Sequence, residues 1–220
     1  MERTLDIELS ELNDMILKMG NMTETAIAKS IEALKNRDDK LSLEIVEEDK
    51  LIDEMENEID EKCVTLIATK QPMAVDLRFI TTAMKICTDI ERIGDLAVDI
   101  AQKNLELVNL PLLKPLIDTP KLADIAKKMV NMSINAFVSR DAGSTLKLRE
   151  LEKESDKLRN VICDELTELM EKDPASVPRA LPLFLIARFL ERACDHAMNI
   201  AEDIVYMVEG RVVKHLHQKM

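Results

Sequence analysis

The chain repeats itself after about a hundred residues, and this internal repeat constrains its fold more than any other feature. Residues 91–95 read Glu-Arg-x-x-Asp, and residues 191–195 read the same. Residues 33–38 match residues 136–141 at an offset of 103, which falls to 100 at the Glu-Arg-x-x-Asp motif. A repeat of this length holds several secondary-structure elements, so it predicts two related units in tandem.

Apolar residues recur every three or four positions through most of the chain, which is typical of amphipathic helices. Only 2% of the residues are aromatic and only 4 are glycine, while 46% are hydrophobic. This composition argues against an all-β fold and favours long helices with an aliphatic core. We predict an all-α fold of two tandem three-helix bundles, related in sequence and built from six long helices. The expected helices span residues 5–36, 40–69, 120–139, 142–172 and 178–209, and a further helix follows the turn at residues 70–78 and continues to residue 108.

Three of the seven prolines lie in residues 109–120, which marks the best boundary in the chain. Leucine and isoleucine are frequent in the same stretch, so we expect a packed connection and not a loose linker. The predicted organisation is a first repeat over residues 1–109, a connector over 110–119, a second repeat over 120–210 and a basic C-terminal tail over 211–220.

The charge and the cysteines limit the classes of partner. A formal net charge of −12 makes nucleic acid and anionic membranes poor partners. No window approaches 18 uninterrupted apolar residues, so we expect no direct membrane insertion. The four cysteines are widely spaced within predicted helices, which favours small buried residues in a reducing cytoplasm. They are Cys63, Cys87, Cys163 and Cys194.

Each half carries pairs of acidic residues that are separated by four positions. Residues four apart on a helix share one face, where like charges repel unless a cation lies between them. With 42 acidic residues in 220, chance gives about eight such pairs, so a single pair carries little information. Recurrence at matching places in both halves favours metal ligation. The candidate ligands are Asp49, Asp53, Glu91, Asp95, Asp99, Glu152, Asp156, Glu191 and Asp195.

The residues beside these acids suggest other roles. Arg92 and Arg192 could neutralise the acids as ordinary ion pairs. Arg92, Arg192, His196 and Asn199 could also contact the metal ligands or a partner protein, and for His196 a partner contact or a packing role is expected. Gly94 is unusual within a helix, because glycine costs up to about 1 kcal/mol relative to alanine there. A close contact with another helix is its expected explanation.

Oxygen-only sites suit hard cations, namely Mg²⁺, Ca²⁺, Mn²⁺ or iron, with Zn²⁺ less favoured. The chain has no Glu-x-x-His pair, no glycine-rich phosphate loop and no convincing nucleophile–base set. We therefore expect no catalysis. Two alternatives stay open: a metal-dependent carboxylate enzyme, and a structural helical bundle that binds no metal.

The chain resembles the PhoU family of phosphate-transport regulators over nearly its whole length. The most specific segments are residues 71–78 (Gln-Pro-Met-Ala-Val-Asp-Leu-Arg), the Asp-x-x-x-Asp of residues 49–53, residues 91–95 and residues 190–202. The resemblance implies two three-helix bundles with multinuclear metal clusters, often of iron. The first cluster would use Asp49, Asp53, Glu91, Asp95 and Asp99, and the second would use Glu152, Asp156, Glu191 and Asp195.

The second half departs from the first in two places near its proposed cluster. Cys194 stands where the first half has Gly94, and Asn199 stands where it has Asp99. An amide is a weaker ligand than a carboxylate, so the two sites are not expected to be equally occupied.

The resemblance also implies the function. Such a protein would be a cytoplasmic homodimer that acts as an adaptor between the ATPase of a phosphate ABC transporter and a sensor histidine kinase. It would restrain phosphate uptake and phosphate-starvation gene expression when phosphate is plentiful.

Overall fold

The computed structural model describes residues 4–213, and these residues form helices and contain no strand. The all-α prediction is confirmed. The α-helices are α1 (Thr4–Asn36), α2 (Asp39–Glu48), α3 (Lys50–Lys70), α4 (Ala74–Leu107), α5 (Asp118–Ser139), α6 (Thr145–Lys172) and α7 (Val177–Glu209). Short 3-10 turns, η1 (Ala142–Ser144) and η2 (Pro174–Ser176), precede α6 and α7.

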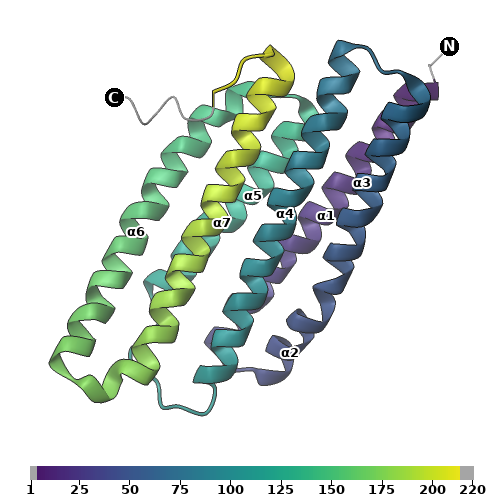
Figure 1. Ribbon diagram of the computed structural model, residues 1–220. Coiled ribbons are helices and arrows are strands. Elements are labelled where there is room, and N and C mark those ends of the chain that lie inside the picture. The colour runs from purple at the N-terminus through teal and green to yellow at the C-terminus, as the bar shows by residue number, and fades with distance from the viewer. Residues whose placement is uncertain (1–3, 214–220) are drawn as a thin grey trace.

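The helices form two three-helix bundles that lie side by side along one long axis (Figure 1). The first bundle contains α1, α2 with α3, and α4, and the second contains α5, α6 and α7. The pair α4 and α7 makes the most extensive contact between helices, and α1 also packs on α5. The two halves therefore meet along two helix pairs, and their buried residues form one continuous hydrophobic cluster.

That core is aliphatic, as the composition predicts, because leucine, isoleucine, alanine and methionine fill most of its positions. Its aromatic contact joins the two bundles: the rings of Phe79 in α4 and Phe137 in α5 stack with centroids 5.0 Å apart. All four cysteines are free and buried, which confirms their interpretation as small core residues.

The second predicted helix, residues 40–69, is wrong as a single element, since it is divided at Asp49 into α2 and α3. Asp49 keeps right-handed helical angles (φ −57°, ψ −37°). Its carbonyl oxygen accepts from the N–H of Ile52 at 2.8 Å, a tight bond across three residues, as well as from Asp53 at 3.2 Å. This turn lets α2 incline away from the axis of α3 (Figure 1), and it places the bend at a candidate ligand.

The other predicted ends differ by a few residues. Helix α5 begins at Asp118, two residues inside the predicted connector. The stretch 142–144 is a 3-10 turn because the side chain of Asp141 accepts from the N–H of Gly143 (2.8 Å), so α6 begins at Thr145. Gly210 ends α7 with φ 68°. Residues 214–220 of the predicted tail lie outside the described residues.

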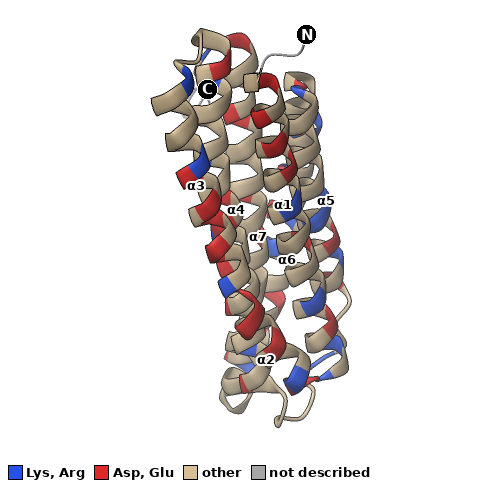
Figure 2. Ribbon diagram, turned by 90° about the vertical axis from the view of Figure 1, so that its right-hand side faces the viewer, with Lys and Arg blue, Asp and Glu red and all other residues tan. Residues whose placement is uncertain are grey.

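None of the helices within residues 4–213 combines the length and the apolar character that a membrane span needs. Acidic residues instead follow one another along α2 and α3 at the surface (Figure 2). This acidic edge contains the first of the two carboxylate clusters.

Candidate metal centre

Helices α3 and α4 approach closely at Gly94, and this contact positions the first cluster. A β-carbon at Gly94 would lie 3.1 Å from Cδ1 of Ile52 and 3.5 Å from Oδ1 of Asp49. The prediction that Gly94 serves a helix–helix contact is confirmed. Because the two backbones come so near, the acids of α3 face those of α4. We call Asp49, Asp53, Glu91 and Asp95 the first cluster.

The repulsion between these carboxylates shows in their proton affinities. Burial, with the charges of Asp53 and Asp95, raises the pKa of Asp49 to about 6. Burial and the charge of Asp95 raise the pKa of Glu91 to about 7, although Arg92 opposes the shift. Asp49 and Glu91 thus both lie within reach of the negative charges of Asp53 and Asp95. A cation between α3 and α4 would remove this penalty.

Glu56 extends the first cluster and was missed from the sequence. It adds to the negative charge that raises the pKa of Glu91, and its Oε1 accepts from the hydroxyl of Thr88 at 3.2 Å. Its position, three residues after Asp53, places it on the same helical face. Glu56 does stand four residues before Asp60, but the matching position in the second half is Arg159, so a search for acids that recur in both halves passes over it.

Arg92 lies at the outer edge of the first cluster. It pairs with Asp95 at 2.9 Å and with Glu91 at 3.4 Å, and its side chain is 56% exposed. Arg92 therefore forms the ion pairs considered from the sequence, but it reaches the acids from the solvent-exposed side of the cluster. Such exposed pairs contribute only about 0–1 kcal/mol, and the pKa of Glu91 stays raised beside it.

Asp99 lies one turn beyond Asp95 and also faces the second bundle. Burial and the charge of Asp95 raise the pKa of Asp99, while Arg192 of α7 lowers it. Asp99 is thus shared between the first cluster and a basic residue of the other half. Arg192, predicted to neutralise the acids of its own half, acts here on an acid of the first half.

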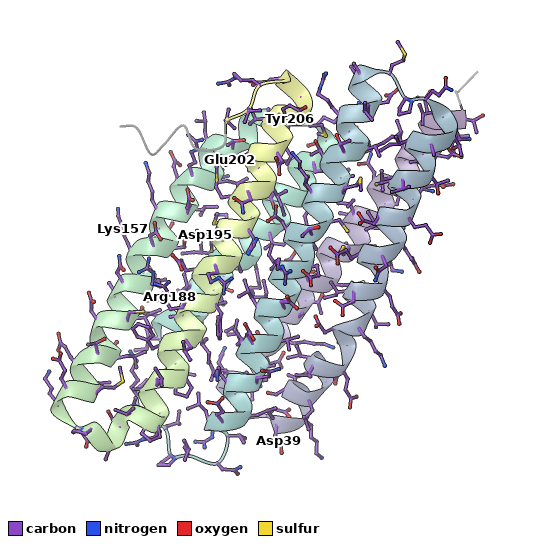
Figure 3. All side chains as sticks on the ribbon, in the orientation of Figure 1. Asp39, Lys157, Arg188, Asp195, Glu202 and Tyr206 are labelled. Atoms are coloured by element: carbon purple, nitrogen blue, oxygen red, sulfur yellow. The ribbon has the colours of Figure 1, made fainter. Side chains whose placement is uncertain are left out.

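The second cluster contains Glu152 and Asp156 of α6 with Glu191 and Asp195 of α7. Burial and the charges of Glu191 and Glu152 raise the pKa of Asp195 to about 6. Burial and the negative charges of Asp156 and Glu202 raise the pKa of Glu152. Figure 3 shows Asp195 midway along α7 with Glu202 nearer its C-terminal end.

A cation of the chain itself lies in the second cluster. Nη2 of Arg159 is 3.1 Å from Oε1 of Glu191 and 3.5 Å from Oδ1 of Asp156. Arg159 could not be identified from the sequence, because its contact with Glu191 depends on how α6 packs on α7. The residues that indicated a metal site are all acids. The two clusters therefore differ in how their negative charge is balanced.

His196 and Asn199 point away from the second cluster and toward α4. His196 Nδ1 lies 2.8 Å from Oδ1 of Asp89, and Nδ2 of Asn199 lies 3.4 Å from the same oxygen. The packing contact expected of His196 is thus made with the other half of the same chain, and Asn199 approaches the same aspartate. No motif in the sequence indicates a role for Asp89, since its partners belong to the other repeat.

Among residues 4–213, no three His, Cys, Asp or Glu side chains stand in positions that would hold a metal ion together. The donor chemistry of the two clusters can still be compared. The first cluster presents carboxylates alone, with Arg92 only at its exposed edge, and this set suits a hard cation. The second cluster already contains a guanidinium between two of its acids, so it fits an added cation poorly.

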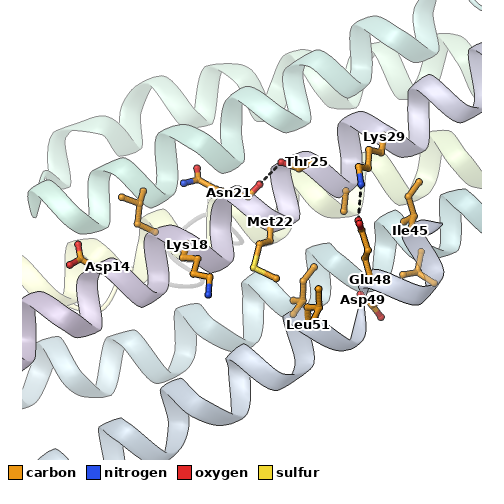
Figure 4. A pocket seen from close by; sticks show the side chains of 14 residues that line it. Asp14, Lys18, Asn21, Met22, Thr25, Lys29, Ile45, Glu48, Asp49 and Leu51 are labelled. Carbon is orange, nitrogen blue, oxygen red and sulfur yellow. Dashed lines mark hydrogen bonds and ion pairs between the residues drawn. The ribbon is translucent and has the colours of Figure 1, made fainter. Parts of the chain in front are cut away.

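A separate cavity of about 560 Å³ opens between α1 and the α2–α3 turn. Figure 4 shows Lys29 of α1 paired with Glu48, and Asp49 beside Glu48. Nζ of Lys29 lies 2.8 Å from Oε2 of Glu48. Asp49 belongs to both the cavity lining and the first cluster. The remaining acids of the first cluster do not line this cavity.

Comparison with known proteins identifies the family. The PhoU domain model matches residues 16–103 and 119–204. The phosphate-specific transport system accessory protein PhoU homolog of Aquifex aeolicus is 38% identical over 212 residues, which cover 96% of each chain. The Pseudomonas putida homolog is 34% identical over 100% of this chain and 86% of its own length.

Solved structures agree with this result. The crystal structure of PhoU from Pseudomonas aeruginosa is similar with a TM-score of 0.90 and 33% identity, covering 94% of this chain and 100% of that one. The crystal structure of the phosphate transport system regulatory protein PhoU from Streptococcus pneumoniae is similar with a TM-score of 0.89 and 27% identity. The match covers 96% of this chain and 99% of that one. The domain model matches once in each half of the chain, and the chain belongs to the PhoU family.

Proposed function

We propose that this protein is an accessory regulator of phosphate transport that restrains uptake and phosphate-starvation gene expression when phosphate is plentiful. One observation carries the proposal: the similarity to relatives named as phosphate-specific transport accessory proteins extends over the whole chain, with 96% of each chain aligned in one case. A regulator that acts through contacts needs no catalytic set of its own.

The proposed partners are the ATPase of a phosphate ABC transporter and a sensor histidine kinase, and the proposed setting is the cytoplasm. The resemblance further implies a homodimer. An acidic, helical surface of the kind seen along α2 and α3 (Figure 2) would favour basic patches on such partners. Long rigid helices also suit an adaptor, because they hold two docking faces at a constant separation.

We also propose that the first cluster binds metal ions, with iron implied by the resemblance and Mg²⁺, Mn²⁺, Ca²⁺ or Zn²⁺ as alternatives. Asp49, Asp53, Glu91 and Asp95 would have to turn toward one another to hold the ion, because no three of these side chains stand in ligating positions, and Asp99 would lie at its edge. The raised pKa values of Asp49 and Glu91 support the proposal, since burial and the negative charge of neighbouring acids both disfavour their ionised forms. A bound cation would tie α3 to α4 and set the shape of the acidic surface.

Deletion of the gene tests the regulatory proposal. We expect the deletion strain to take up phosphate in excess and to express phosphate-starvation genes in phosphate-rich medium. A plasmid copy of the wild-type gene should restore both. Reduced or unchanged uptake in the deletion strain would contradict the proposal.

Elemental analysis of protein purified without chelator tests the metal proposal. Wild-type protein should contain metal, and the double substitution Glu91→Gln with Asp95→Asn should remove it while preserving side-chain size. Circular dichroism of the variant should match that of wild type. Absence of metal from both proteins would contradict binding at the first cluster.

A further inference from the structure

We propose that the guanidinium of Arg159 is the permanent cation of the second cluster, so that this half takes no metal ion. The contrast with the first cluster rests on the metal binding proposed above. The chain would then have one half whose carboxylates depend on a cation from solution and one half that carries its own. Only the first half would respond to metal availability.

The contacts of Arg159 match those expected of a bridging cation. Its Nη2 reaches Glu191 on α7 at 3.1 Å and Asp156 on its own helix at 3.5 Å. The side chains of Arg159 and Glu191 are only 20% and 11% exposed, so water screens the pair weakly. The guanidinium thus joins α6 to α7 where a metal would join the same two helices.

The repeat shows what occupies this place in the first half. The offset of 103 that aligns the second and fifth predicted helices aligns Arg159 with Glu56. Both residues border their clusters: Arg159 pairs with Glu191, and Oε1 of Glu56 accepts from the hydroxyl of Thr88 on α4 at 3.2 Å, one turn before Glu91, which aligns with Glu191. One structural position therefore adds negative charge in the first half and removes it in the second.

This exchange changes the charge that each cluster presents. With Arg92, which pairs with Glu91 and Asp95, the first set counts five acids and one base, a formal charge of −4: Asp49, Asp53, Glu56, Glu91, Asp95 and Arg92. The second counts four acids and one base, a formal charge of −3: Glu152, Asp156, Arg159, Glu191 and Asp195. A divalent ion entering the second set would meet a positive guanidinium and would have to displace it from two carboxylates. Removing a partner from such a shielded pair is costly.

The first test uses metal-free protein in chelator and measures thermal unfolding. Arg159→Gln should lower Tm by roughly 3 to 8 °C, because it leaves Glu191 and Asp156 without their cation. Arg159→Lys should retain part of the stability, and adding Glu191→Gln to Arg159→Gln should recover most of the loss. The matched change Glu56→Gln should instead raise Tm. An unchanged Tm in Arg159→Gln would overturn the proposal.

The second test measures Mn²⁺ binding by calorimetry after chelator removal. Wild-type binding should be lost with Glu91→Gln/Asp95→Asn and retained with Glu191→Gln/Asp195→Asn. Arg159→Glu, which copies the first half, should add a second class of Mn²⁺ sites, and Glu56→Arg should abolish the first. Equal loss of wild-type binding from either double substitution would overturn the proposal.

The outcomes separate this inference from the proposed function. If wild-type protein binds no Mn²⁺, the metal proposal for the first cluster fails. The coupling between Arg159→Gln and Glu191→Gln in chelator still decides whether Arg159 balances the second cluster.

Discussion

Nδ1 of His196 in α7 lies 2.8 Å from Oδ1 of Asp89 in α4, within the helix pair that joins the two halves. Asn199 approaches the same oxygen at 3.4 Å. The two side chains of the histidine–aspartate pair are largely shielded, with exposed fractions of 21% and 16%. A residue that suggested an external partner therefore serves an internal contact between the repeats.

This pair should couple energetically. Asp89→Asn and His196→Gln are each expected to reduce the free energy of unfolding by about 0.5–1.5 kcal/mol, because a partly buried hydrogen bond is lost or weakened. The double variant should lose less than the sum of the two. Urea denaturation of the four proteins measures the coupling. Strictly additive losses would show that the two side chains act independently.

Gly20 should be intolerant of a side chain because α1 meets α5 there. A β-carbon at Gly20 would overlap Cδ1 of Ile134 and lie 3.1 Å from its Cγ1. Ile134 is buried and β-branched, so it has little room to turn. We expect Gly20→Ala to destabilise the protein by about 1–3 kcal/mol, although alanine is the better helix former.

A second substitution checks the cause of that loss. Ile134→Val removes the Cδ1 methyl group that would clash, so Gly20→Ala should cost less in an Ile134→Val background. Thermal unfolding of the two single variants and the double variant measures the difference. An equal cost in both backgrounds would exclude the clash with Ile134.

Arg37 should stabilise the junction between α1 and the end of α4. Its backbone is left-handed (φ 56°), and its guanidinium donates to the carbonyl oxygens of Val108 and Leu110 and, at 3.4 Å, of Leu107. Arg37→Ala should cost about 1–3 kcal/mol, since it removes charge-assisted hydrogen bonds and keeps the unfavourable φ. Arg37→Gly should cost less, because glycine adopts positive φ without strain. Chemical denaturation compares the two, and a larger loss in Arg37→Gly would contradict this account.

The metal-free protein should lose stability as the pH rises from about 4 to about 7. The folded-state pKa values of Asp49 and Glu91, about 6 and about 7, exceed their ordinary values of 3.8 and 4.5. The folded protein therefore binds more protons than the unfolded chain in this window, and its free energy of unfolding falls as they dissociate. We expect the free energy of unfolding to fall by about 1–3 kcal/mol. Asp195, whose pKa is also raised, contributes to this loss in the same direction.

Denaturation in chelator at several pH values measures this slope. Glu91→Gln carries no titratable group at position 91, so its stability should depend less on pH than that of wild type. Added Mn²⁺ should recover stability at the alkaline end if the first cluster binds it. Stability that rises steadily over the same pH window would contradict the assigned direction of the pKa shifts.

The helices and the paired acids could be predicted because their signals are local. Apolar spacing marks the buried face of each helix, and the repeat brings matching acids of the two halves into alignment. The division at Asp49 carries no such signal, since no proline or glycine lies there, and it follows from backbone geometry. Glu56 lies on the predicted face, yet comparison with the second half conceals it, because an arginine occupies the matching position.

The sequence by itself determined the all-α class, the two repeats and the helical faces on which the carboxylates lie, because these depend on residue spacing along one chain segment. Only the tertiary structure decided which charges meet. The rotation and axial position of α6 against α7 bring Arg159 to Glu191, and those of α4 against α7 bring Asp89 to His196. Contacts between helices depend on how all the core side chains pack at once, and no spacing within a single helix encodes that result.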